Sequence, residues 1–159
     1  MTKSKSTGIN WNVLIISLIV VYAVGFIGSL FTSPNTGTEW YQSVKPSLTP
    51  PSIVFPIVWN ALFFLIGISL YLAWTNTDKK GKKMVALVFA INFALNILWS
   101  VFYFGLKNPV LASVEILFLI ASIILMITTT YKINRKSSWL LWPYLIWVCF
   151  ATILSFMSI

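Results

Sequence analysis

Long apolar stretches alternate with short polar or proline-rich segments along this 159-residue chain. A transmembrane helix needs about 20 mainly apolar residues, because about 30 Å of hydrocarbon is crossed at a rise of about 1.5 Å per residue. Five stretches meet this length, and the short links between them imply antiparallel neighbours in one bundle. We therefore expect a single five-helix domain over residues 1–159, with helices at about residues 12–31, 53–74, 84–105, 110–131 and 139–159.

The composition agrees with a membrane protein. Hydrophobic residues make up 58% of the chain and charged residues 9%, whereas an ordinary soluble domain is about 25% charged. The predicted fold class is an all-α membrane protein, a single bundle of five transmembrane helices. The chain has no histidine and one cysteine, which excludes Ser-His and Cys-His catalysis and most metal-ligand sets. We therefore expect neither a metal site nor a required cofactor.

The positive charges predict how the bundle is oriented. Five crossings place the N-terminus and the second and fourth loops on one side, together with nine of the eleven Lys and Arg residues. Because positive residues favour the cytoplasm, we expect a multi-pass plasma-membrane protein with a cytoplasmic N-terminus and an external C-terminus. The net charge of +8 then reflects topology, and no nucleic-acid partner is expected. The nine residues are Lys3, Lys5, Lys79, Lys80, Lys82, Lys83, Lys132, Arg135 and Lys136, and the other side holds Lys45 and Lys107.

Polar and aromatic side chains share one face of the third predicted span. Spacings of three or four residues place them on one side of a helix. We expect this face to point into the bundle and to line a ligand site. The alternative is that its two asparagines only tie helices together, since an interhelical amide bond contributes about 0.6–2 kcal/mol. The face consists of Asn92, Asn96, Trp99 and Tyr103.

Small residues recur every four positions on roughly the opposite face of the same span, at Ala86, Ala90 and Ala94. Small side chains let two helix backbones approach closely within a membrane. We therefore expect this stripe to form the interface of a homodimer.

Two tryptophans lie deep in spans that contain prolines. Trp59 follows Pro56 in the second span, and Trp147 follows Pro143 in the fifth. Tryptophans near span ends are commonly interface anchors, but this explanation weakens for tryptophans at greater depth. Large aromatic rings beside small residues predict a slot for a flat ring. We place Phe63, Ala151 and Ser155 in the same slot.

The first loop, residues 32–52, is long for a compact bundle. Loops beyond about 12–15 residues are usually functional or disordered. This loop carries the aromatic pair Trp40-Tyr41 and then three prolines, Pro50 and Pro51 among them. The prolines stiffen the loop, and the aromatic pair offers an apolar patch that can fold back over the helix ends. We interpret it as an external lid.

Glu115 is the one carboxylate well inside a predicted span. An intramembrane acid is a functional candidate, because an unpaired charge in hydrocarbon costs several kcal/mol. Glu115 lies near the outer end of its helix and close to Lys107, so capping or pairing near the surface is the simpler interpretation and proton transfer the alternative. Cys149 is most simply a small buried apolar residue.

Three separated motifs carry a family resemblance. They are WY-x3-KP-x3-PP-x3-FP-x-VW at residues 40–59, N-x3-N-x2-W-x3-YFGLKNP at residues 92–109 and WPY-x2-W-x3-AT-x-LS at residues 142–155. In this order they resemble the translocator protein family, also called the TspO/MBR or peripheral-type benzodiazepine receptor family, in its bacterial type. The similarity covers about residues 11–159.

The resemblance implies a five-helix bundle, usually dimeric, with a pocket near the first loop. That pocket binds porphyrins such as protoporphyrin IX and synthetic benzodiazepine-type ligands. By motif, Trp59 and Trp147 correspond to tryptophans associated with light- and oxygen-dependent porphyrin breakdown in bacterial relatives, so we expect them to be the catalytic pair if the protein is an enzyme. Many relatives carry Asn at Ser155 and Asp at Glu115. By the same motifs, Asn92 and Ala151 match pocket positions. Pro50 and Pro51 match the loop-to-helix junction, and Trp40 and Tyr41 match the lid.

Three classes of function stay open. The leading hypothesis is a binding protein for protoporphyrin-like tetrapyrroles with slow photo-oxidative turnover, serving stress or haem-pathway control. The second is a porphyrin transporter, although transporters generally place a titratable residue or an inverted repeat at mid-membrane and the sequence indicates neither. The third is a membrane scaffold or regulatory subunit without a ligand of its own.

Overall fold

The computed structural model describes residues 8–159, which form helices and no strands. Five helical segments within this range are long and apolar enough to span a membrane, which confirms the predicted all-α, five-span fold class. Lys3 and Lys5, which contribute to the predicted charge bias, lie outside the described residues. The elements are α1 (Trp11–Thr32), α2 (Glu39–Val44), α3 (Val54–Thr75), α4 (Lys79–Ser100), the π-helix η1 (Val101–Gly105), α5 (Pro109–Ile133), α6 (Arg135–Trp139) and α7 (Trp142–Met157).

Two spans differ from the prediction at their ends. α4 begins at Lys79 rather than near residue 84, because the Asp78 carboxylate accepts a hydrogen bond from the Gly81 amide (2.8 Å) and caps the helix. The predicted fifth span is split into α6 and α7. Pro143 stands in the first turn of α7, where a residue without an N–H is tolerated and a continuous helix through it is not.

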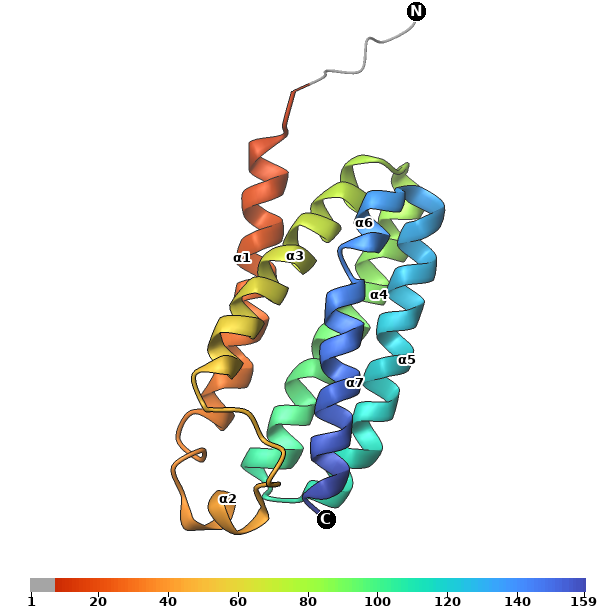
Figure 1. Ribbon diagram of the computed structural model, residues 1–159. Coiled ribbons are helices and arrows are strands. Elements are labelled where there is room, and N and C mark those ends of the chain that lie inside the picture. Colours follow the sequence, from red (N-terminus) through yellow and green to blue (C-terminus); the bar gives the residue numbers. More distant parts are fainter. Residues whose placement is uncertain (1–7) are drawn as a thin grey trace, which may run out of the picture.

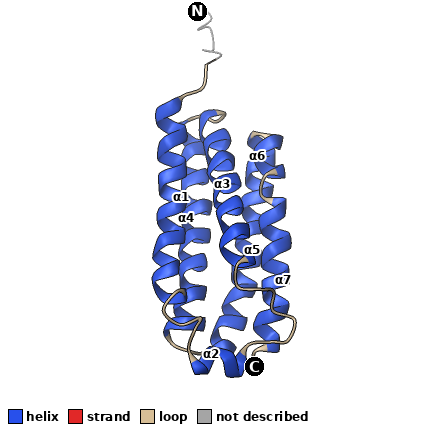
Figure 2. Ribbon diagram, turned by 60° about the vertical axis from the view of Figure 1, so that its left-hand side comes forward, coloured by secondary structure: helices blue, strands red, loops and turns tan. Residues whose placement is uncertain are grey.

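The helices pack as an antiparallel bundle. α1 lies beside α3 and α4, and α5 lies between α4 and α7 (Figure 1; Figure 2). Phe89, Ile123 and Tyr144 are fully or almost fully buried in the core between them. On the outside, Phe118 and Ile146 are 62% and 67% exposed, as expected for helix faces that contact lipid.

α3 and α7 diverge along the bundle. At one end Ser69 of α3 and Ser137 of α6 exchange two hydrogen bonds, each hydroxyl donating to the other residue's carbonyl oxygen at 2.9 and 2.7 Å. Toward α2, α3 leans to α1 and away from α7 (Figure 1). We call the first end, around α6, the closed end and the second the lid end.

Residues 33–53, here called the lid, fold over the second end of the bundle. They contain α2, which lies at the same end of the bundle as the C-terminus of α7 (Figure 1; Figure 2). The Trp40 ring meets the edge of Tyr103 at 5.9 Å, and the Tyr41 ring lies 5.6 Å from Phe104. The aromatic pair of the first loop therefore packs on η1.

The end of α4 widens into η1, which the sequence pattern did not predict. The Leu106 amide donates to the Val101 carbonyl oxygen, five residues back, at 2.7 Å. In this segment the consecutive residues Tyr103 and Phe104 are both buried. The π-turn thus presents two adjacent rings to the lid.

Candidate ligand-binding cavity

A cavity of about 910 Å³ lies inside the lid end of the bundle. Ligand pockets typically measure about 300–1,000 Å³, so this one is large. All five spans and the lid contribute to its lining. It gathers side chains from the three separated sequence motifs. The predicted site residues that line it are Tyr41, Pro50, Trp59, Phe63, Asn96, Trp99, Tyr103, Trp147, Ala151 and Ser155.

Trp59 forms part of the α3 wall. Its ring lies 5.3 Å from Phe63 in a tilted arrangement and 6.1 Å from Tyr144, which it meets edge-on. The Phe63 ring in turn occupies the space that a β-carbon at residue 25 would need, so the glycine at Gly25 lets α1 approach α3 closely. Packing on two sides holds the Trp59 indole at the cavity surface.

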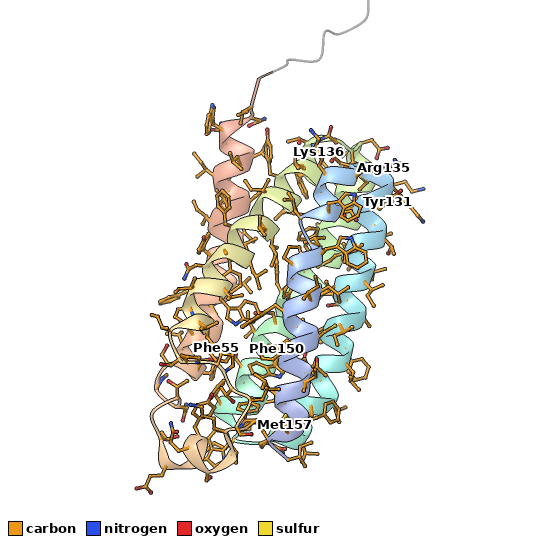
Figure 3. The ribbon with its side chains drawn as sticks, in the orientation of Figure 1. Phe55, Tyr131, Arg135, Lys136, Phe150 and Met157 are labelled. Carbon is orange, nitrogen blue, oxygen red and sulfur yellow. The ribbon has the colours of Figure 1, made fainter. Side chains whose placement is uncertain are left out.

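Trp147 forms part of the α7 wall. It contacts Phe55 edge-on at 5.8 Å and Phe150 at 5.6 Å. Phe55 at the start of α3 and Phe150 on α7 lie at the same level of the bundle (Figure 3). The two indoles of the predicted catalytic pair therefore line one cavity from different helices, although their chemical role stays a prediction.

Trp99 contributes a third indole. Its ring stacks on Tyr103 at 5.1 Å and an interplanar angle of 22°. The Tyr103 hydroxyl pairs with the Ser158 hydroxyl at 2.7 Å. In contrast, the indole nitrogens of Trp99 and Trp147 are buried without a hydrogen-bond partner. Both side chains thus line the cavity, while their N–H groups are buried and have no acceptor among the described residues.

A polar chain of four side chains links α4, α5 and α7 beside the cavity. The Asn96 amide donates to the Tyr144 hydroxyl (3.1 Å), which donates to the Asn92 carbonyl oxygen (3.3 Å). The Asn92 amide donates to the Ser122 hydroxyl (2.9 Å). Asn92 is 1% exposed and does not line the large cavity. The buried Tyr144 side chain packs against it and donates to its carbonyl oxygen. At Asn92 the geometry favours the helix-tying alternative.

Trp40 and Pro51 also lie outside the cavity lining. Trp40 covers Tyr103 from the lid, and the Lys107 ammonium lies 5.9 Å above its ring. Pro51 is exposed at the surface of the lid. These two positions can therefore act on the cavity only through the lid. The dimer-interface candidates Ala86, Ala90 and Ala94 are exposed on α4, and their role stays a prediction.

Glu115 is neither paired nor capping, contrary to the simpler interpretation. It is 5% exposed, and neither carboxylate oxygen has a hydrogen-bond partner in the part of the chain that the structure describes. α4 and α5 are antiparallel and are joined by the Asn92–Ser122 bond, so Glu115, two turns from Ser122, lies at the level of Trp99. Cys149 is likewise not buried but exposed on the outer face of α7.

Tyr41 is a titratable side chain that the lid brings to the cavity, in addition to Lys45. Burial raises the pKa of its phenol, and the nearby Tyr103 hydroxyl raises it further. The phenol therefore stays neutral well above physiological pH and can donate a hydrogen bond into the cavity.

Several lining residues were not predicted as site residues. They include Lys45, Thr49, Phe55 and Asn60. Lys45 and Phe55 each precede a proline of the first motif, so that motif contained a usable signal. Among residues 8–159, Lys45 is also the single charged residue of the lining, but in the sequence it counted only toward topology.

Comparison with known proteins agrees with this architecture. Residues 17–158 match the TspO/MBR family. The tryptophan-rich protein TspO of Archaeoglobus fulgidus is 44% identical over 144 residues, which cover 90% of this chain and 92% of that protein. The human translocator protein is 31% identical over 134 residues (82% and 79%), and the tryptophan-rich sensory protein of Cereibacter sphaeroides is 29% identical over 119 residues (74% and 73%). The chain is a membrane protein of the TspO/MBR family.

Proposed function

We propose that the cavity binds protoporphyrin IX-like tetrapyrroles and that the protein serves stress or haem-pathway regulation. The observation that carries this proposal is the lid-covered cavity of about 910 Å³ with three indoles in its lining. A planar macrocycle gains free energy from burial of its apolar area and from offset stacking on aromatic rings. Mostly apolar walls with a few polar groups are typical of small-molecule sites.

Slow, light-dependent porphyrin breakdown is the chemical part of the proposal. Light makes the bound ring a stronger one-electron oxidant, and an indole is a competent electron donor. Trp59 or Trp147 gives one electron to the excited ring, the reduced ring passes it to dissolved dioxygen to form superoxide, and the indole radical then recovers its electron from the ring. The net change is a one-electron oxidation of the porphyrin by dioxygen, and combination of the porphyrin radical cation with superoxide adds oxygen to the ring. Both indoles line the same cavity, so either is within reach of a ring that fills it.

Titration of the purified protein in neutral detergent tests both parts. Protoporphyrin IX fluorescence should be quenched stoichiometrically. Replacement of both Trp59 and Trp147 by Phe should abolish the light-driven spectral change while leaving binding. The matched control is Trp139→Phe, since Trp139 is 66% exposed at the far end of the bundle. Identical photoproducts from the double variant would refute the catalytic part, and the lack of quenching or of any shift in melting temperature would favour a ligand-free scaffold.

Transport is the second candidate, and Glu115 is the observation that favours it. An unpaired acid in a membrane helix is a common element of proton relays, and Glu115 is buried rather than paired at the surface. Uptake of labelled porphyrin into proteoliposomes should then depend on a proton gradient and be lost in Glu115→Gln. Uptake that ignores the gradient would contradict proton-coupled transport.

We also propose that the lid end faces the outside of the plasma membrane. Arg135 and Lys136 lie at the opposite end of the bundle from Met157 (Figure 3), as do the lysines of α4. In a Cys149→Ser background, an impermeant thiol reagent applied to intact cells should label Ser47→Cys in the lid and spare Asn76→Cys. The reverse pattern would invert the orientation. A separate experiment tests the homodimer that the small-residue stripe of α4 predicts. In the same Cys149→Ser background, the purified Ala90→Cys variant should form a crosslinked dimer.

A further inference from the structure

We propose that the closed end of the bundle carries a binding site for the head group of an anionic phospholipid, formed by Lys132, Arg135 and Lys136 where α5 turns into α6. The occupant is a lipid of the surrounding bilayer, with its phosphate at these three cations and its acyl chains along α5. This site lies at the other end of the molecule from the cavity, so it does not depend on what the cavity binds.

The first observation is the charge of the closed end. Among residues 8–159, seven cations lie there on the turns from α3 to α4 and from α5 to α6, against one acid, Asp78. The Asp78 carboxylate already accepts a hydrogen bond from the Gly81 amide (2.8 Å), and α4 has no acid in its first turn. A surface with this excess of positive charge favours an anionic partner. The cations are Lys79, Lys80, Lys82, Lys83, Lys132, Arg135 and Lys136.

The second observation is that the corner between α5 and α6 is firmly held. Asn134 is extended between the two helices, and its backbone N–H donates to the Thr130 carbonyl oxygen at 2.7 Å. Its side-chain oxygen accepts a hydrogen bond from the Ser137 amide (3.2 Å). The buried Ser138 hydroxyl donates to the Ile127 carbonyl oxygen at 3.0 Å and so ties α6 back to α5. The backbone that carries the three cations is therefore fixed before a lipid arrives.

The third observation is the set of aromatic rings around this corner. The Arg135 guanidinium lies 5.3 Å above the Tyr131 ring (Figure 3), and this contact orients the arginine. A planar guanidinium can donate two parallel hydrogen bonds to a phosphate group. Trp139 and Trp142 lie 6.3 Å apart and are 66% and 43% exposed. Exposed tyrosine and tryptophan rings are typical of the head-group level of a bilayer, where lipid phosphates lie.

An apolar stripe continues from this corner along α5. Phe118, Leu125 and Lys132 are spaced by seven residues and therefore share one side of the helix. Phe118 is 62% exposed and Leu125 is 45% exposed. An anion with acyl chains matches this surface over its whole length, because the phosphate meets the cations while a chain covers the stripe. Inorganic phosphate or an acidic protein segment would use only the cations. Basic sites beside membrane helices commonly bind anionic lipid head groups in this way.

The test compares two lipids that differ in head-group charge. The purified protein in dodecyl maltoside is titrated with phosphatidylglycerol or phosphatidylcholine of the same acyl chains, and bound lipids are counted by native mass spectrometry. A cation near an anionic lipid surface raises affinity about fivefold. We expect the wild type to bind phosphatidylglycerol about fivefold or more tightly than phosphatidylcholine. A triple variant with Lys132→Gln, Arg135→Gln and Lys136→Gln should lose this preference.

The matched control removes the same charge at the same end of the bundle but from α4. It combines Lys79→Gln, Lys80→Gln and Lys83→Gln, and it should keep most of the preference for phosphatidylglycerol. Unchanged binding of phosphatidylcholine shows that both triple variants are folded. Equal affinities of the wild type for the two lipids would overturn the proposal. Equal losses in the two triple variants would overturn the site at the corner of α5 and α6, since net charge alone would then decide lipid binding.

Discussion

The closed end and the lid end of the bundle use polar side chains in opposite ways. At the closed end Ser69, Ser137 and Thr130 are completely buried, and each hydroxyl has a hydrogen-bond partner. At the lid end Trp99 and Trp147 bury N–H groups that have none. An unsatisfied buried donor costs about 1–3 kcal/mol. The comparison indicates that the closed end satisfies its buried polar groups within the protein, whereas the lid end leaves two buried donors without an acceptor among the described residues.

The largest effect on the free energy of unfolding is expected from the loss of an aromatic ring in the core, outside the cavity. Phe89 is 2% exposed and meets Phe93 edge-on at 5.9 Å. Phe89→Ala should lower the free energy of unfolding by about 3–5 kcal/mol, because a buried aromatic side chain is lost and a cavity left behind. Porphyrin affinity of the folded fraction should not change. Unfolding in a denaturing detergent and fluorescence quenching measure the two quantities.

The paired variant at the lid end is Phe55→Ala. Phe55 is half-buried, lines the cavity and supports Trp147. We expect a smaller loss of stability than for Phe89→Ala and a clear loss of porphyrin affinity. If both variants lowered stability and affinity in the same proportion, the division of roles between the two ends would be wrong.

The fold could be predicted because length and hydrophobicity are enough to identify a membrane-spanning helix. Helix ends could not, since they depend on single side chains: the Asp78 cap extends α4 by one turn and more, and Pro143 separates α7 from α6. The π-turn of η1 was missed for another reason. Trp99 and Tyr103 are four residues apart, and this spacing puts them on one face of an α-helix as well as of a helix with a π-turn. The hydrophobic pattern therefore cannot tell the two kinds of helix apart.

The aromatic walls of the cavity could be predicted, but its polar features could not. Trp59 and Trp147 are conspicuous at depth in proline-containing spans. Whether an indole N–H or Lys45 finds a partner depends on residues far away in the sequence, so no local pattern records it. Glu115 was misjudged because its position along α5 suggested contact with the surface, whereas its direction around the helix buries it.

Replacement of Glu115 should have the second-largest effect on the free energy of unfolding, and it should raise this free energy rather than lower it. Its carboxyl is buried without a partner, and such a group costs more than an apolar side chain of similar size. Glu115→Met should raise the free energy of unfolding by about 1–4 kcal/mol. The exposed acid Glu39 provides the control, since Glu39→Gln should leave stability within about 0.5 kcal/mol. If Glu115→Met lowered the free energy of unfolding instead, the Glu115 carboxyl would have a hydrogen-bond partner in the ligand-free protein.

At the closed end, removal of one hydroxyl should have a moderate effect. Ser137→Ala takes away the hydroxyl that bonds to Ser69 and should cost about 0.5–1.5 kcal/mol, the net value of one intramolecular hydrogen bond. A double-mutant cycle with Ser69→Ala isolates the pair. A coupling energy near zero would mean that the two serines act only through their small size.

The smallest effect concerns the lid and appears only at high pH. Burial raises the pKa of Tyr41, so the folded lid holds the neutral phenol more tightly than the unfolded chain does. The stability contributed by this group is therefore fully present below the ordinary tyrosine pKa of about 10 and is lost as pH rises through the higher value in the folded protein. The difference in tyrosinate absorbance between wild type and Tyr41→Phe should titrate with a midpoint above about 10 in mild detergent. In a denaturing detergent the midpoint should return to the ordinary value, and equal midpoints in the two detergents would mean that the lid does not bury Tyr41.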